Sequence, residues 1–297
     1  MAAEYVCNVC DPAGAPVERP KVFLVKPNVR RIRDERFLVW RCVRCGTIHA
    51  HGEVDLDAYY RDYPFFGGPL DWRLRVMYEV LLRRLTRAGV TREQRILDYG
   101  CGGGKLVAYM RERGFTRAVG YDEYAAGFSD PALLELRYDA VVSQDVIEHV
   151  AAPWELLRTF ERLVEPGGVI ALGTPDAAAI DLTEAESFVH ALHQPYHRHI
   201  LSRHGLLAAG EAMGWELVRY YSTMYNNTLF PFLNSRFITH YLAINDDTID
   251  AAFEPIRVLN PKLWTLETFL YGFLGFFFPT KTDVMAVFRA PRGAASG

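Results

Sequence analysis

Glycines at 100, 102 and 104 follow the pattern G-x-G-x-G directly after a short apolar segment, in the stretch Arg95-Ile-Leu-Asp-Tyr-Gly-Cys-Gly-Gly-Gly-Lys105. Glycine allows a tight backbone turn with positive φ and lets a ligand approach the main chain closely. A dinucleotide fingerprint would need glycine at position 105, where this chain has lysine. In α/β proteins a strand end, a glycine turn and the next helix N-terminus form one face of a nucleoside pocket. The stretch therefore predicts a nucleoside-binding turn at Gly100, Gly102 and Gly104.

An acidic residue follows this turn at the spacing expected for a ribose contact. Asp122 lies 22 residues beyond Gly100, and an acid that binds ribose hydroxyls is expected about 20 residues on. A carboxylate suits this role because it can accept hydrogen bonds from two neighbouring hydroxyls. The segment between Asp122 and the next strand is too short for a full helix and strand.

Four of the five cysteines form two C-x-x-C pairs, Cys7 with Cys10 and Cys42 with Cys45. Two such pairs predict a structural zinc site with four thiolate ligands, which is coordinatively closed and does no chemistry. A redox pair and incidental thiols are the alternatives. Cys101, inside the glycine turn, is interpreted as a small residue that fills space beneath the ligand.

Histidines that could act as bases occur in two places, each directly after an apolar strand. The first is Glu148-His149, and the second is His193-Gln-Pro-Tyr-His-Arg-His199. Histidine titrates near neutral pH and can remove a proton from a bound substrate. For His149 the alternative is that it caps a helix or packs beneath the ligand.

Alternating strand and helix patterns must position these residues. Apolar strands are predicted at 95–99, 117–121, 138–144, 169–174, 215–222 and 283–290. Helices are predicted at 71–88, 105–114, 153–164 and 201–214. This order predicts an α/β fold with a Rossmann-like sheet and helices on both faces.

In order, these segments resemble class I S-adenosylmethionine (SAM)-dependent methyltransferases. The stretch 98–104 is similar to that family's first motif, 139–150 to its fourth-strand motif, and Pro166-Gly-Gly168 to its turn before strand five. The resemblance implies that Asp98 and the glycine turn hold the methionine part of SAM and that Asp122 holds the ribose. It also implies cofactor contacts from Gln144 and Asp145 in the fourth-strand motif. The family's adenine-contacting acid is not assigned, because the segment after Asp122 is short; Asp130 and Glu135 are candidates.

Two narrower resemblances concern the histidines. Ubiquinone-type O-methyltransferases carry a Glu-His pair similar to that at 148–149, which implies a catalytic role for His149. Tyr196-His-Arg-His199 resembles the Tyr-His-Glu-His motif of zinc-containing nucleotide-sugar C-methyltransferases, which implies acid/base roles for Tyr196 and His199. Those enzymes also begin with a cysteine-rich module, but here Arg198 replaces the glutamate and their large C-terminal domain is missing.

The chain is expected to divide into four parts. These are a zinc-ribbon-like module at 1–56, a lid segment and leading helix at 57–90, a SAM-binding core at 91–223 and 283–292, and an apolar insertion at 224–282. Tyr59, Tyr60 and Tyr63 in the lid segment could line the ligand cleft or pack the linker onto the core. The insertion, between the last two strands, is interpreted as a substrate cap. It could cover an apolar acceptor, rest on a membrane surface, form a dimer interface, or pack against the core.

Composition places further bounds on function. The 297 residues carry a net charge of −3, so no global positive field favours nucleic acid. Arginines at 30, 31, 33, 36, 41 and 44 make the first module locally basic, which fits a solvated face, a phosphate-bearing substrate or an RNA contact. No signal peptide and no run of about 20 apolar residues is found, so a cytoplasmic location without a membrane span is expected.

The sequence therefore predicts a SAM-dependent methyltransferase with structural Zn²⁺. Its expected acceptor is a small molecule, either a sugar nucleotide, a natural-product intermediate or a lipid-like compound, methylated at carbon or oxygen. An rRNA or tRNA methyltransferase and a SAM-binding protein without catalysis are the alternatives.

Overall fold

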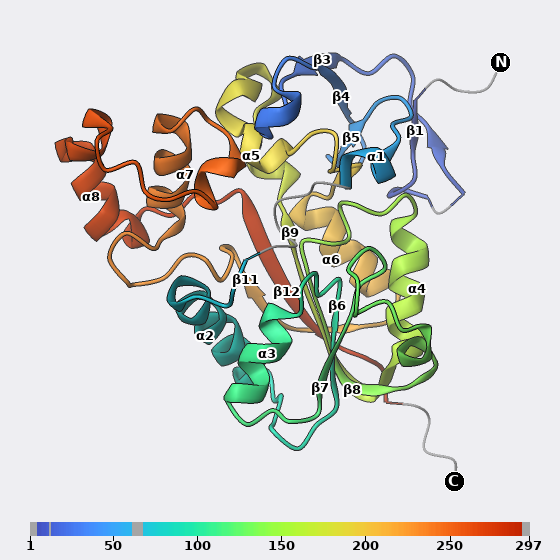
Figure 1. The fold of residues 1–297 in the computed structure, drawn as a ribbon. Helices are drawn as coiled ribbons and strands as arrows, with labels where there is room; N and C mark the ends of the chain where they lie inside the picture. The colour runs from blue at the N-terminus through green and yellow to red at the C-terminus, as the bar shows by residue number, and fades with distance from the viewer. Residues whose placement is uncertain (1–4, 12, 61–67, 293–297) are drawn as a thin grey trace, which may run out of the picture.

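A six-stranded sheet forms the centre of the computed structural model, which describes residues 5–11, 13–60 and 68–292 (Figure 1). Its strand order is β11-β12-β9-β8-β6-β7. The strands are β6 (Ile96–Tyr99), β7 (Ala118–Tyr121), β8 (Tyr138–Gln144), β9 (Val164–Pro175), β11 (Glu216–Tyr221) and β12 (Asp283–Arg289). Strands β7, β6, β8 and β9 are parallel, whereas β12 runs antiparallel to both β9 and β11. The Rossmann-like sheet predicted from the sequence is confirmed.

Helices cover both faces of this sheet, because successive side chains of a strand point to opposite faces. Val169 and Ala171 of β9 pack with helices α2 (Trp72–Arg87) and α3 (Lys105–Glu112). Ile170 and Leu172 of the same strand pack with α4 (Pro153–Leu163) and α6 (Arg203–Ala212). The sheet is thus packed between an apolar layer on each face. The carboxyl ends of its parallel strands lie side by side at one edge of the sheet.

Side-chain caps set the beginnings of two helices. Asp71 accepts a hydrogen bond of 3.0 Å from the Leu74 N–H, so α2 begins at Trp72, one residue after the predicted start at 71. Ser202 accepts one of 3.0 Å from the Gly205 N–H, so α6 begins at Arg203 and not at 201. Between β7 and β8 the described chain forms only a short 3₁₀ turn, η3 (Pro131–Glu135). This agrees with the sequence-based expectation that the segment is too short for a full helix and strand.

The N-terminal module shares a sheet with the core. Strands β1 (Val6–Cys7) and β2 (Ala15–Pro16) pair with each other. A second sheet has the order β10-β5-β4-β3 and combines β3 (Val22–Val25), β4 (Phe37–Arg41) and β5 (Ile48–Ala50) with β10 (His199–Ile200). Because β10 comes from the segment after β9, this sheet attaches the module directly to the core. The sequence did not predict this pairing.

Two short helices lie next to the N-terminal module in the sequence or lead back to it. Helix α1 (Leu56–Tyr60) follows the module and leads into the lid segment. Helix α5 (Val189–Leu192) precedes the histidine-rich turn that runs into β10.

Residues 224–282, called the cap below, form helices α7 (Ser235–Ile244) and α8 (Leu266–Leu274) with short 3₁₀ turns, beyond one edge of the central sheet (Figure 1). Helix α8 buries Thr268 and Gly272, whereas Phe273 is 57% exposed. Apolar side chains are exposed along this part of the cap, at Leu259, Trp264, Leu266, Phe269, Leu270, Phe273, Leu274, Phe277 and Phe278. Packing against the core, one of the sequence-based alternatives, therefore does not hold for these side chains. Among the described helices, none is long and apolar enough to cross a bilayer.

Candidate active site

The glycine turn between β6 and α3 has the conformation that its sequence requires. Gly100, Gly102 and Gly104 have φ angles of 78°, 52° and 69°, which side-chain-bearing residues rarely adopt. A Cβ on Gly100 would lie 2.2 Å from Val146 Cγ2, and one on Gly104 would lie 2.0 Å from the Phe128 ring. Both positions therefore need glycine for close packing as well as for the turn.

Asp122 connects this turn to the end of β7. Its Oδ2 accepts a hydrogen bond of 2.9 Å from the Gly102 N–H. Its Oδ1 accepts two more, of 2.9 Å and 3.0 Å, from the N–H groups of Tyr124 and Ala125. These bonds fix the carboxylate at the carboxyl edge of the sheet, where ligands bind in open α/β folds.

Four carboxylates, called the acidic rim below, follow this sheet edge: Asp98, Asp122, Asp145 and Asp283. Burial, with a smaller contribution from the charge of Asp122, raises the pKa of Asp98 to about 7. Burial and the charge of Asp283 raise the pKa of Asp145 to about 7, and burial raises that of Asp283 to about 6. A cation beside the rim would favour the charged form of every one of these groups. The site therefore fits a positively charged ligand.

Three residues at the rim were not predicted from the sequence. Tyr78 of α2 and Tyr225 at the start of the cap have ring centroids 5.8 Å apart. Burial raises the pKa of both phenols, with further contributions from the charges of Asp98 and Asp145. Asp283 begins β12, and the antiparallel direction of that strand places its start at the same sheet edge as the end of β9. The strand predicted at 283–290 begins at Asp283, and this start was the sequence signal that could have identified the residue.

The structure places the side chain of Gln144 against the sheet. Its Nε2 donates to the carbonyl oxygens of Ser143 and Ala171 at 2.9 Å and 3.4 Å. A Cβ on Gly173 would lie 2.1 Å from its Oε1. In this conformation the amide covers β9, so its contact with a cofactor stays a prediction.

Aromatic and imidazole rings gather next to the acidic rim in what we call the Tyr/His cluster: Tyr60, His149, His193, Tyr196 and His197. The Tyr60 hydroxyl lies 2.7 Å from His149 Nδ1. The Tyr60 ring stacks on Tyr124 with centroids 5.1 Å apart, two residues beyond Asp122. Tyr60 therefore links the cluster to the ribose end of the predicted cofactor site, whereas Tyr63 lies outside the described residues.

Glu148 lies beneath this cluster and is fully buried. Its Oε2 accepts a hydrogen bond of 3.0 Å from the Thr174 hydroxyl, and its Oε1 lies 3.9 Å from His197 Nε2. Burial raises the pKa of Glu148 well above its usual value, with an added contribution from Asp145. Burial lowers the pKa of His149 to about 4, so this imidazole is neutral near pH 7.

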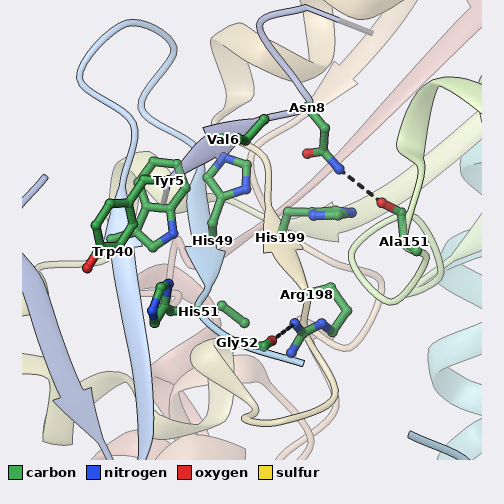
Figure 2. A pocket seen from close by; sticks show the side chains of 11 residues that line it. Tyr5, Val6, Asn8, Trp40, His49, His51, Gly52, Ala151, Arg198 and His199 are labelled. Atoms are coloured by element: carbon green, nitrogen blue, oxygen red, sulfur yellow. Dashed lines mark hydrogen bonds between the residues drawn. The ribbon is translucent and has the colours of Figure 1, made fainter. Parts of the chain in front are cut away.

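The structure separates the surroundings of Tyr196 and His199, the two acid/base candidates of the Tyr-His-Arg-His motif. Tyr196 is buried in the Tyr/His cluster, where its hydroxyl donates to the Tyr59 carbonyl oxygen at 3.2 Å. His199 pairs with His49 across β10 and β5, and their ring centroids lie 5.9 Å apart. Both of these histidines line a pocket of about 260 Å³ together with Arg198 (Figure 2). His199 thus contacts the N-terminal module.

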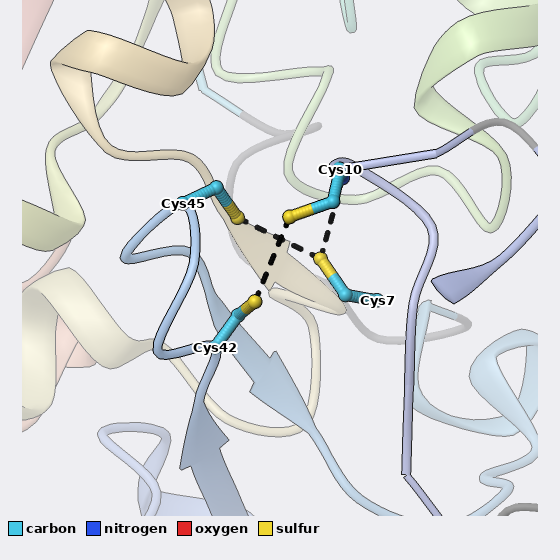
Figure 3. Close-up of side chains that lie close together, drawn as sticks. All are labelled: Cys7, Cys10, Cys42 and Cys45. Carbon is cyan, nitrogen blue, oxygen red and sulfur yellow. Dashed lines mark hydrogen bonds between the residues drawn. The ribbon is translucent and has the colours of Figure 1, made fainter. Parts of the chain in front are cut away.

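The four cysteines of the two pairs lie together, with the Sγ atoms all within 4.8 Å of one another (Figure 3). Cys7 Sγ and Cys45 Sγ are 3.6 Å apart, and Cys10 Sγ and Cys42 Sγ are 3.7 Å apart. Zinc–sulfur bonds of about 2.3 Å in a tetrahedron place sulfur atoms about 3.8 Å apart. The arrangement is compatible with a four-thiolate zinc site. Disulfide bonds would need a much shorter sulfur–sulfur distance.

Most arginines of the N-terminal module have internal partners. Arg30 forms ion pairs with Asp246 and Glu254 of the cap. Arg41 donates to the carbonyl oxygens of Gly46, Ala177 and Ile180, three acceptors within the protein. Arg31, Arg36 and Arg44 also donate to backbone carbonyl oxygens. These contacts favour structural roles for the arginines over an RNA contact.

The chain is similar to known methyltransferases in the region that contains this site. A methyltransferase domain family matches residues 73–220. Over 127 residues the chain is 36% identical to a ubiquinone biosynthesis O-methyltransferase of Caulobacter sp. (strain K31), covering 34% of this chain and 50% of that protein. A protein of the same name from Xanthomonas oryzae pv. oryzae is 29% identical over 149 residues, covering 42% and 61% of the two chains.

The chain thus spans about half the length of the curated relatives that it matches. Among solved structures, a SAM-dependent methyltransferase from Mesorhizobium loti is similar, with 16% identity and a TM-score of 0.42. The match covers 75% of this chain and 99% of that one.

Proposed function

Residues 73–220 belong to the class I SAM-dependent methyltransferases, and from this we propose that the protein transfers the methyl group of SAM to a small-molecule acceptor. The observation that carries the proposal is the acidic rim beside the glycine turn. SAM has a sulfonium and an ammonium group, and such charges would stabilise the ionised forms of Asp98 and Asp145. Asp98 and the turn at 100–104 would hold the methionine part, and Asp122 would bind the ribose hydroxyls. Bound SAM supplies an electrophilic methyl group.

The Tyr/His cluster supports proton transfer from the acceptor. His149 is neutral and hydrogen-bonded to Tyr60, so the pair can accept and pass on a proton at the Tyr60 hydroxyl. Tyr196 packs on the same ring of Tyr60 with centroids 5.3 Å apart. We therefore propose His149 and Tyr196 as acid/base residues. His199 lines the pocket in Figure 2, so a role for His199 would act through that pocket.

An oxygen acceptor has more support than a carbon acceptor. The relatives that match the chain are named as O-methyltransferases. The narrower likeness to sugar C-methyltransferases depends on a motif whose Glu is Arg198 here and whose His199 contacts His49. We propose O-methylation of a molecule that combines a hydroxyl group with an apolar portion.

We propose that the cap, residues 224–282, covers the acceptor and contacts a further apolar partner through its exposed face. Exposed apolar patches of this kind mark interaction surfaces. A lipid bilayer and a second copy of the chain are the partners that the sequence allowed. Flotation with phospholipid vesicles and sedimentation of the protein alone distinguish the two.

Titration calorimetry of the zinc-loaded protein with S-adenosylhomocysteine tests the central proposal. We expect binding in wild type and a loss of about tenfold or more in Asp122→Asn, because hydrogen bonds to a charged group contribute about 1.5–3 kcal/mol. Glu161→Ala, an exposed change on α4, is the matched control and should bind as wild type does. Absence of binding to folded wild type would remove the proposal. Binding without methylation of any phenol or sugar nucleotide would favour a non-catalytic SAM-binding protein.

A further inference from the structure

The pocket of about 260 Å³ in Figure 2, called the junction pocket below, lies where the N-terminal module meets the core. Three separate parts of the chain line it: residues 5, 6 and 8, residues 40 and 49–52, and residues 151, 198 and 199. Its volume is just below the roughly 300–1,000 Å³ of pockets for drug-sized molecules, so an occupant must be small. Neither the predicted SAM contacts nor the Tyr/His cluster includes a residue that lines this pocket.

Three buried polar atoms of the residues that line this pocket have no hydrogen-bond partner within the part of the chain that the structure describes. They are Asn8 Oδ1, His49 Nε2 and His199 Nε2. Both histidines are 4% exposed. Buried polar atoms nearly always have a partner, because a buried donor or acceptor without one costs free energy. Three such atoms around one pocket therefore indicate a site for a polar ligand.

The junction pocket offers hydrogen-bond donors and a positive charge. Burial lowers the pKa of His49 to about 3 and that of His199 to about 4, so both imidazoles are neutral near pH 7. A neutral imidazole carries one N–H donor. Arg198 Nη2 donates to the Gly52 carbonyl oxygen at 2.6 Å, which leaves further N–H groups of the guanidinium for a ligand. Burial lowers the pKa of Arg198, and among the described residues no neighbouring carboxylate opposes this shift.

Ring stacking fixes the imidazole of His49 on the side of the pocket that the module forms. The Trp40 ring stacks on His49 with centroids 4.4 Å apart, and Tyr5 stacks on His51 with centroids 4.8 Å apart. Tyr5 and Trp40 meet edge-to-face at 5.6 Å. Figure 2 shows these rings on one side of the pocket and Arg198 on the other. An anion with a small apolar portion matches a charged group that faces aromatic rings.

We propose that the junction pocket is a second ligand site, which binds the oxyanion of a small molecule, a phosphate or a carboxylate group. Arg198 supplies the charge, because an arginine fork matches the spacing of two oxyanion oxygens. The N–H groups of His49 and His199 donate to the anion, and Asn8 Oδ1 accepts from a hydroxyl of the same ligand. The occupant connects three separate segments, so its binding stabilises the attachment of the module to the core. The inference does not depend on methyl transfer.

Calorimetric titration of the zinc-loaded, full-length protein with inorganic phosphate tests this site, in chloride buffer of constant ionic strength. We expect saturable binding in wild type and binding at least about tenfold weaker in Arg198→Gln, which loses hydrogen bonds from a charged group. Arg198→Glu, the residue of the motif that 196–199 resembles, should abolish binding by repulsion. His49→Phe keeps an aromatic ring against Trp40 but removes the N–H, and it should also weaken binding.

Arg36→Gln is the matched control, because it removes the same charge from an exposed position of the same module and does not line the pocket. It should bind phosphate as wild type does. Equal weakening in Arg36→Gln and Arg198→Gln would show a general charge effect and would overturn the proposal. Absence of saturable phosphate and acetate binding to folded wild type would overturn it as well.

Glycerol phosphate and acetate identify the source of the oxyanion. Tighter binding of glycerol phosphate than of inorganic phosphate would assign the site to a small phosphate ester, equal binding to a free anion, and tighter binding of acetate to a carboxylate. Each of these outcomes supports the site.

Thermal unfolding gives a second measurement that needs no variant. Saturating phosphate should raise the melting temperature of wild type, because a ligand that binds only the folded state stabilises it. An unchanged melting temperature would contradict the stabilisation of the junction. Failure of wild type to bind S-adenosylhomocysteine would refute the proposed function alone, and the phosphate titration would still decide this site.

Discussion

Replacing Asp98 by asparagine should remove part of the pH dependence of both stability and cofactor binding. Asp98 is 5% exposed at the end of β6, and burial beside Asp122 raises its pKa from 3.8 to about 7. Asparagine has the same shape and no charge. The substitution therefore removes the titration of one group and keeps its packing.

The sign follows from the direction of this shift. Between about pH 4 and 7 the folded protein keeps the proton on Asp98 that the unfolded chain has lost, so stability falls as pH rises through this window. A shift of about 3 pKa units corresponds to about 4 kcal/mol between the two protonation states. Without ligand, Asp98→Asn should therefore be more stable than wild type above pH 7, by up to about this amount. The two proteins should converge near pH 4.

Ligand binding should depend on pH in the opposite direction. The ammonium group of S-adenosylhomocysteine is expected to bind next to the ionised carboxylate, so this ligand should bind wild type about tenfold more weakly for each pH unit below 7 through Asp98 alone. The Asp98→Asn protein should bind S-adenosylhomocysteine weakly. Binding to this variant should be coupled to the release of one proton fewer than binding to wild type, so its affinity should change less with pH.

Denaturant unfolding at pH 5 and 8 and calorimetry from pH 5.5 to 7.5 measure these differences. Asp145 and Asp283 titrate in the same range, so the informative quantity is the difference between variant and wild type. An Asp98→Asn protein that is less stable than wild type at pH 8, with an unchanged pH slope of binding, would refute the reasoning.

Three other perturbations address the remaining parts of the molecule. Chelation of metal, or Cys42→Ser, should remove zinc and lower the melting temperature, because metal binding contributes directly to folding; metal analysis and calorimetry measure both. Gly100→Ala, whose Cβ would lie 2.2 Å from a valine methyl group, should cost about 1–3 kcal/mol of stability and weaken binding of S-adenosylhomocysteine. Replacing the exposed Phe273 and Phe277 by serine should reduce vesicle flotation or self-association with little change in melting temperature.

Each of these has a control and an opposing outcome. Gly127 also has positive φ, at 89°, but no atom within 4 Å of an added Cβ, so Gly127→Ala separates backbone strain from the clash at Gly100. Equal effects of the two substitutions would contradict the role of close packing. Retention of fold and melting temperature after complete metal removal would contradict a structural zinc site. A wild-type protein that remains monomeric and does not float with vesicles would contradict an interaction role for the cap face.

Features with a local sequence signal could be predicted, and features that depend on distant pairing could not. The turn at Gly100 to Gly104 and the position of Asp122 follow from short-range spacing, and the structure has both at the carboxyl edge of the sheet. The separation of His199 from Tyr196 depends on β10 pairing with a strand 150 residues earlier in the chain, at His49. No local pattern encodes that pairing.

The same limit applies to the cap and to the hydrogen bonds that connect Asp247, His190, Asn28 and His193. Composition identified residues 224–282 as an apolar insertion, but composition cannot tell whether an apolar side chain points inward or outward. Asn28 and His193 are 165 positions apart, and asparagine in a loop carries no sequence signal for contact with an imidazole. Asp247 could be connected with them only after the cap had been placed against the module.

The pairing of β10 with β5 also limits how the protein could be re-engineered. The backbone N–H of Ala50 donates to the Arg198 carbonyl oxygen at 2.9 Å, and the N–H groups of Arg198 and His199 donate in turn to Glu148. A chimaera that transplants the first 56 residues onto another methyltransferase would lack the recipient strand that completes their sheet. A shortened chain that starts after them would present an uncovered edge to neighbouring molecules and would be prone to aggregate.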